Sequence, residues 1–204
     1  MSEVAAEDGV EQPVTDEENG GRRPHLVLIV ALAVAAVVAL LVVVAAIAKS
    51  GTKDSADTPL MGQAAPIVQT NTIDGQPFDL AARRGSWVVM NFFSTWCQPC
   101  VAEHPALLAF AQQQAAQPDG AELVTVVFND SLDAVRTFFQ QHGGTWPKLA
   151  DPDGRIQVAF GVAKSPETWI IDPDGIVRAR IISQVTTADL DALLGQLKVA
   201  SAGG

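Results

Sequence analysis

The longest apolar run in the chain lies near its amino terminus. Residues 26–48 carry no charged side chain and consist of Ala, Val, Leu and Ile. As a helix, this run would span roughly 34 Å, enough to cross the hydrocarbon core of a bilayer. The pattern predicts one transmembrane helix at residues 25–48. The alternative is a signal peptide cleaved near Ala48, although the apolar core of a signal peptide usually has only about 7–15 residues.

The segments on both sides of this run are polar. Residues 1–24 carry seven acidic and two basic side chains, which predicts a disordered acidic tail. Residues 49–60 form a predicted polar linker, and residues 61–204 are long enough for one domain with its own core. Two basic residues flank the apolar run on each side, so the positive-inside rule favours a cytoplasmic amino terminus only slightly.

Apolar runs and turn residues within 61–204 predict a mixed α/β domain. Buried strands are predicted at 87–93 and 122–128, where the runs are rich in β-favouring residues. The other predicted elements are a hairpin over 67–80 that turns at Asp74-Gly75, a helix over 99–116, a helix from Ser131 to 141, a loop at Trp146-Pro147, a short helical or irregular piece at 155–160, a hairpin of strands 168–171 and 176–182, and a helix over 187–199 capped by Thr186 or Thr187. This order predicts a mixed sheet covered by helices on both faces.

The charge of the chain excludes one class of partner. From residue 49 onward there are 16 acidic and 11 basic side chains, without a stripe of Lys or Arg. Proteins that bind nucleic acids usually present such a basic patch. We therefore expect no nucleic-acid partner.

The two cysteines of the chain form the motif Cys97-Gln98-Pro99-Cys100. A bridge between them closes a very small loop and stabilises the fold little, so we expect a chemical role. The motif follows a predicted strand and begins a predicted helix, which places the first sulfur at the helix amino terminus. Free N–H groups there stabilise a thiolate, the nucleophile of disulfide exchange. Cys97 is thus predicted to attack and Cys100 to resolve the mixed disulfide.

Metal binding is the alternative chemistry for this motif. A structural zinc site needs four ligands, and the chain has no second cysteine pair. Cys97, Cys100 and His104 are an alternative ligand set for copper delivery, because Cys100 and His104 share a helix face. The preferred interpretation has no metal and no cofactor beyond the redox-active disulfide.

The sequence from Phe93 to Cys100 (FSTWCQPC) resembles the active-site segment of thioredoxin-like proteins, and Pro105 matches the proline inside their active-site helix. Further matches are similar to the membrane-anchored TlpA/ResA/CcmG (DsbE) group, which is associated with cytochrome c maturation. They are Asn91, Thr95-Trp96-Cys97, Ala102-Glu103-His104, Gly161-Val162 and residues 165–172 (SPETWIID). The resemblance covers residues 64–199 and implies a thioredoxin-like fold with an amino-terminal hairpin extension.

The resemblance assigns roles to individual residues. Pro166 would be the cis-proline that faces the disulfide, and the backbone at Ser165 would pair with the substrate chain. Trp96 either shields the sulfurs and lines a substrate surface or, as an aromatic residue before a CxxC motif, caps the core. Glu103 would carry protons for Cys100, although a carboxylate exposed on the helix surface is an alternative. Asn91 replaces the buried aspartate of thioredoxin. Beside the proline, Glu167 is a further candidate for tuning the site or selecting partners.

The resemblance also implies a cellular role. It predicts an extracytoplasmic reductase of protein disulfides, such as the haem-attachment cysteines of apocytochrome c, reduced in turn by a membrane donor of the CcdA/DsbD type. A cytoplasmic dithiol domain would need no anchor, whereas a domain at the outer face of the membrane could take electrons from a membrane partner. This favours a single-pass protein of the cell membrane with a cytoplasmic amino terminus. A disulfide-forming oxidase with the same residues is the alternative direction. A peroxidase of the peroxiredoxin kind is disfavoured, because its cysteine motif (PxxxTxxC) is absent from the sequence.

Overall fold

The computed structural model describes residues 24–49 and 58–203. The chain divides into two units, Met1–Gly51 and Thr52–Gly204. The predicted acidic tail, apart from residue 24, and most of the predicted linker lie outside the described residues. The boundaries predicted for the tail, anchor, linker and domain therefore stay predictions.

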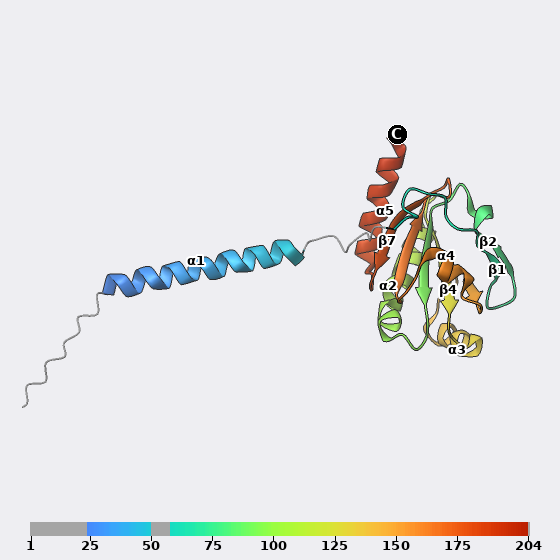
Figure 1. The fold of residues 1–204 in the computed structure, drawn as a ribbon, viewed down its shortest axis with the longest axis horizontal. Helices are drawn as coiled ribbons and strands as arrows, with labels where there is room; N and C mark the ends of the chain where they lie inside the picture. The colour runs from blue at the N-terminus through green and yellow to red at the C-terminus, as the bar shows by residue number, and fades with distance from the viewer. Residues whose placement is uncertain (1–23, 50–57, 204) are drawn as a thin grey trace, which may run out of the picture. The chain divides into compact units, whose positions relative to one another are not determined.

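The described part of the first unit is the helix α1 (Pro24–Lys49) (Figure 1). Its side chains are described between residues 28 and 41, and the large apolar ones among them are more than half exposed. When only the residues with described side chains are considered, which in α1 are 28–41, no helix is long and apolar enough to cross a membrane. The transmembrane anchor stays a prediction from the sequence.

The second unit is built on a five-stranded sheet with the strand order β5-β4-β3-β6-β7 (Figure 1). The central strand β3 (Val88–Phe93) is buried along its whole length. It runs parallel to β4 (Glu122–Phe128) and antiparallel to β6 (Glu167–Ile171). The outer strands are β5 (Lys148–Asp151) and β7 (Val177–Ile182). This is the mixed sheet that the strand and helix order predicts.

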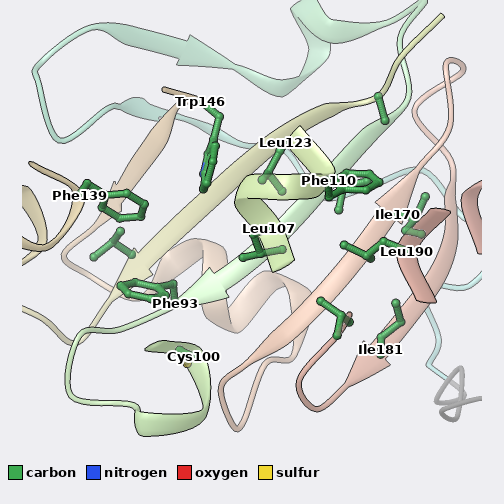
Figure 2. Close-up of a cluster of buried hydrophobic side chains, with 14 of the residues drawn as sticks. Phe93, Cys100, Leu107, Phe110, Leu123, Phe139, Trp146, Ile170, Ile181 and Leu190 are labelled. Carbon is green, nitrogen blue, oxygen red and sulfur yellow. The ribbon is translucent and has the colours of Figure 1, made fainter. Parts of the chain in front are cut away.

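Two buried clusters of apolar side chains lie against this sheet. The first joins the sheet to three helices, α2 (Gln98–Ala115), α3 (Leu132–His142) and α5 (Thr187–Ala202). Figure 2 shows Leu107 and Phe110 of α2 among side chains of the sheet. The second cluster joins the sheet to α4 (Arg155–Phe160) and to the amino-terminal segment of the unit. Both faces of the sheet are therefore covered.

A small hairpin precedes the main sheet. It consists of β1 (Gln69–Asn71) and β2 (Pro77–Asp79), as the sequence predicts. Gly75 adopts a φ of +81° at the predicted turn, a conformation that favours glycine.

Backbone hydrogen bonds fix the amino-terminal segment to both outer strands of the sheet. The N–H of Gly62 donates to Val177 O of β7 at 2.9 Å, and the N–H of Ile73 donates to Lys148 O of β5 at 2.8 Å.

Two elements of the fold were not predicted from the sequence. Residues 148–151, to which no element was assigned, form strand β5, which pairs in parallel with β4. The short 3-10 helix η1 (Leu80–Arg83), which Asp79 caps, was not predicted. Of the two candidate caps of α5, Thr186 is the one that forms a capping box, with Asp189.

Candidate active site around the Cys97–Cys100 disulfide

The two cysteines form a disulfide at the amino terminus of α2, with their Cα atoms 5.2 Å apart. Cys97 is the N-cap residue, and its Sγ accepts the N–H of Cys100 at 3.2 Å. Pro99 occupies the first helical turn, where no N–H donor is needed. The predicted placement is confirmed. In the reduced protein, the N–H of Cys100 and the positive end of the helix dipole would stabilise a Cys97 thiolate.

Both cysteines are buried, but not equally: Cys97 is 5% exposed and Cys100 is 0% exposed. Trp96, directly before Cys97, is 59% exposed. Its indole N–H donates to Asn129 O at 2.9 Å, which holds the ring on the surface. This geometry fits an attacking first cysteine and a buried resolving one.

The bond between Ser165 and Pro166 is cis, as the resemblance implies. In the antiparallel register of β3 and β6, Phe92 stands opposite Glu167, so Phe93 stands opposite Pro166 by continuation. Pro166 therefore lies at the end of β3, where the chain leaves for the CxxC motif. Ser165 is partly exposed and Pro166 is buried.

Glu103 lies one helical turn beyond Cys100 and is only 2% exposed. Its Oε1 accepts from Asn91 Nδ2 at 2.8 Å, and its Oε2 accepts from the N–H of Val185 at 3.0 Å. The alternative of an exposed helix carboxylate is therefore wrong. Glu103 is thus a buried carboxyl group on the same helix as the resolving cysteine.

His104 packs away from solvent among aromatic rings, with Phe138 at 4.9 Å and Trp146 at 5.8 Å between ring centroids. Its Nε2 lies 3.1 Å from Gly143 O. Burial lowers the pKa of His104, because the charged imidazolium loses its hydration. Within the described ranges, no group of three or more His, Cys, Asp or Glu residues is placed to hold a metal ion. The copper interpretation gains no support.

Glu167 belongs to a buried ion pair. It is 1% exposed, and its Oε1 accepts from Arg180 Nε at 2.8 Å and from Trp169 Nε1 at 2.7 Å. The side chain thus links β6 to β7. Trp169 itself is fully buried in the second cluster.

Sequence reasoning missed three residues that hold the active-site loop. Asp130 accepts hydrogen bonds from both the N–H and the hydroxyl of Thr95. Gln184 donates from Nε2 to Pro99 O at 2.8 Å, and Val185 binds Glu103. One signal was available for Asp130: it follows the predicted strand β4, and loops after neighbouring parallel strands meet at one edge of a sheet. The contacts of residues 184 and 185 depend on how α5 docks and carry no local signal.

Comparisons with known proteins agree with this geometry. Residues 61–180 match the model of the AhpC/TSA family. The chain belongs to this family. Within it, the chain is similar to the thiol:disulfide interchange protein HelX of Rhodobacter capsulatus, with 34% identity over 144 residues that cover 67% of this chain and 78% of HelX. It is also similar to the thiol-disulfide oxidoreductase ResA of Bacillus subtilis, with 28% identity over 143 residues that cover 70% of this chain and 79% of ResA.

A solved structure supports the same assignment. The crystal structure of a thiol:disulfide interchange protein of the thioredoxin family from Chlorobium tepidum matches with a TM-score of 0.60 and 27% identity. The match covers 69% of this chain and 98% of that chain. The chain is thus a thiol–disulfide oxidoreductase with a thioredoxin-like fold, a member of the ResA/CcmG (DsbE) group.

Proposed function

We propose that this oxidoreductase reduces protein disulfides outside the cytoplasm, with the haem-attachment cysteines of apocytochrome c among its substrates. The observation that carries the proposal is the pairing of a helix-capping Cys97, next to the exposed Trp96, with a fully buried Cys100 and a buried Glu103 one turn further. A single-pass anchor at residues 25–48, with a cytoplasmic amino terminus, would hold the domain at the outer face. A membrane electron donor of the CcdA/DsbD type would keep it reduced.

The reaction begins with the reduced pair. The Cys97 thiolate attacks one sulfur of the substrate disulfide, and the other substrate sulfur leaves as a thiolate that takes up a proton. Cys100 then loses its proton to Glu103 and attacks Cys97 Sγ, which breaks the mixed disulfide and releases the second substrate thiolate. That thiolate takes up a proton from solvent, and Glu103 returns its proton to solvent. The substrate has gained two electrons and two protons, and Cys97 and Cys100 are oxidised to the disulfide. The donor returns the electrons.

Substrate contact would come from three residues near the sulfurs. Trp96 offers an exposed aromatic surface directly before Cys97. The backbone at Ser165, before the cis-proline Pro166, would pair with an extended substrate segment in the manner of an added strand. Such backbone pairing reads the shape of the substrate more than its sequence.

The direction of electron flow is tested by the reduction potential. Purified protein is equilibrated in thiol redox buffers, and tryptophan fluorescence reports the oxidised fraction, with Cys97→Ala as the control that cannot form the disulfide. A value near that of thioredoxin, about −270 mV, would support a reductase. A value near about −120 mV would favour the oxidase instead, a difference of roughly 7 kcal/mol for two electrons.

Substrates and location are tested in cells that express the protein. In a Cys100→Ser variant, the mixed disulfide at Cys97 is not resolved, so substrates stay covalently attached and can be identified by mass spectrometry. The double variant Cys97→Ser/Cys100→Ser is the control. Recovery of exported proteins with paired cysteines, from the membrane fraction, is the expected result. Capture of cytoplasmic proteins alone would refute the proposed location.

A further inference from the structure

Asn91 occupies the centre of the sheet, directly beneath the active-site helix. It lies in the middle of β3 and is 0% exposed. In the register of the sheet, Asn91 stands opposite Thr168 on β6 and Thr125 on β4. A buried amide costs free energy unless its polar atoms are hydrogen-bonded. Its contacts therefore need an explanation.

Both side-chain hydrogen bonds of this amide to described residues use the same atom. Asn91 Nδ2 donates to Glu103 Oε1 at 2.8 Å and to Thr168 Oγ1 at 3.1 Å. Among the residues that the structure describes, Asn91 Oδ1 has no hydrogen-bond partner. A carboxylate accepts hydrogen bonds and donates none, so this orientation of the amide matches ionised Glu103.

A half-turn of the amide about the Cβ–Cγ bond exchanges Oδ1 and Nδ2. In that orientation Oδ1 would accept a hydrogen bond from protonated Glu103 and another from the hydroxyl of Thr168, because a hydroxyl can either donate or accept. A side-chain amide can thus satisfy both protonation states of Glu103 from one place. An ionised aspartate at position 91 could only accept, and two carboxylates so close would not both ionise readily.

We propose that Asn91 is the positioning residue that keeps Glu103 hydrogen-bonded in both of its protonation states. When Cys100 reacts, its S–H bond breaks and an O–H bond forms on Glu103, and the amide turns to accept from that O–H. When Cys100 is protonated again, both changes reverse. The inference rests on the proposed function only in so far as Glu103 is the proton carrier for Cys100.

The other charged groups near Glu103 are few or already engaged. On α2 itself they are the two cysteines and His104, whose Nε2 contacts Gly143 O. The segment before α5 offers the N–H of Val185. On α5, Asp189 closes the capping box with Thr186, and Asp191 accepts from Gln114. Glu167 on β6 is paired with Arg180.

The experiment follows resolution by Cys100 without any protein substrate. Reduced full-length protein reacts with the aromatic disulfide DTNB, so that Cys97 displaces one thionitrobenzoate and retains the other. Attack by Cys100 releases the second in an intramolecular phase, whose rate does not depend on reagent concentration. The rate of this second phase is measured from pH 5 to pH 9.

We expect Asn91→Leu to slow the second phase by about tenfold at pH 7 and to move its midpoint to higher pH. The reason is that the hydrogen bond lost by ionised Glu103 is stronger than the one lost by its protonated form, so the ionised form is destabilised more. Asn91→Asp should move the midpoint in the same direction, and it keeps the shape of the side chain if the leucine variant does not fold. In a Glu103→Gln background, neither change should move the midpoint.

Thr125→Val is the matched control. Thr125 is buried, neighbours Asn91 on β4 and accepts a hydrogen bond from Trp146 Nε1 at 2.8 Å. This variant should lose stability and keep the wild-type midpoint. An unmoved midpoint in both Asn91 variants, or an equal shift when Glu103 is Gln, would overturn the inference. A reduction potential near that of an oxidase would defeat the proposed reductase and leave this result standing, because Cys100 resolves the mixed disulfide in either direction.

Discussion

His104 illustrates how much the surroundings of one residue change its chemistry. Its ring is buried against Phe138, Phe139 and Trp146, and burial lowers its pKa. The unfolded chain takes up a proton on this imidazole at about pH 6.5, whereas the folded protein resists it. The free energy of unfolding should therefore be unaffected by this group above pH 6.5. It should fall as the pH drops below 6.5, by at most about 1.4 kcal/mol per pH unit.

The measurement is urea denaturation of wild type and of His104→Phe between pH 5 and pH 8. Phenylalanine keeps a ring in the cluster and removes the titration, so the variant should show a shallower loss of stability at acid pH. If the free energy of unfolding fell equally with pH in the two proteins, His104 would not contribute to the loss of stability at acid pH.

Asp130 is a second residue whose role is visible only in three dimensions. It binds the backbone and the hydroxyl of Thr95, the second residue before Cys97. Hydrogen bonds to a charged group contribute about 1.5–3 kcal/mol each when well formed, so Asp130→Ala should lower the free energy of unfolding by about 1–3 kcal/mol. Asp130→Asn, which keeps an acceptor, should lose less.

Asp133→Ala provides the comparison for Asp130→Ala. Asp133 is on the exposed side of α3, its side chain is 92% exposed, and it pairs only with Arg136 among the described residues. Its loss should change stability by no more than about 0.5 kcal/mol. If denaturant unfolding gave equal values for the two alanine variants, the proposed attachment of the active-site loop by Asp130 would be wrong.

At the scale of elements, the ion pair between Glu167 and Arg180 connects β6 to β7. Glu167 is almost fully buried, so its charge depends on Arg180. Arg180→Met should reduce the free energy of unfolding by about 3–5 kcal/mol, because it leaves a buried carboxylate without its partner. The double variant Glu167→Gln/Arg180→Met should regain most of this loss, since glutamine still accepts from Trp169 Nε1. Equilibrium denaturation of the single and the double variant measures both free energies of unfolding. Equal losses of stability in the two variants would contradict this role of the ion pair.

The elements also show which parts of the fold the sequence predicts. β3 and β4 are buried on both faces, so their long apolar runs predict them to within one residue. β5 has only four residues, follows Pro147 and includes Lys148 and Asp151, so no run of apolar residues reveals it. Pairing with β4 makes it a strand, and pairing is a tertiary effect that overrides local propensity.

The candidate site also has features that the local sequence predicts and features that depend on tertiary contacts. The positions of Cys97 and Cys100 follow from a strand, a CxxC motif and a helix, which are all local. The burial of Glu103 does not follow from its neighbours in the sequence, because it depends on Asn91 from β3 and Val185 from the segment before α5. Helical spacing places Glu103 near Cys100, but the two contacts that make it a buried carboxylate come from 12 and 82 residues away.

At the scale of the whole domain, one segment limits how the sheet can meet other molecules. Residues 62–73 cover the start of β7 through Gly62 and Gln63, which both bond to Val177, and part of β5 through Ile73. Deleting residues 58–66 would expose the edge of β7 and remove the packing of Leu60, Met61 and Ala65 on the second cluster. We expect this variant to form concentration-dependent oligomers in light scattering. A deletion of residues 201–203 at the end of α5 should stay at the wild-type size.

The position of this segment in the chain has a consequence for biogenesis. It precedes all five strands of the main sheet, so during synthesis the covering segment is present before either outer strand exists. When β5 and later β7 join the sheet, each meets a ready partner for its free edge. The domain thereby avoids a folding stage in which bare strand edges could pair with a neighbouring chain.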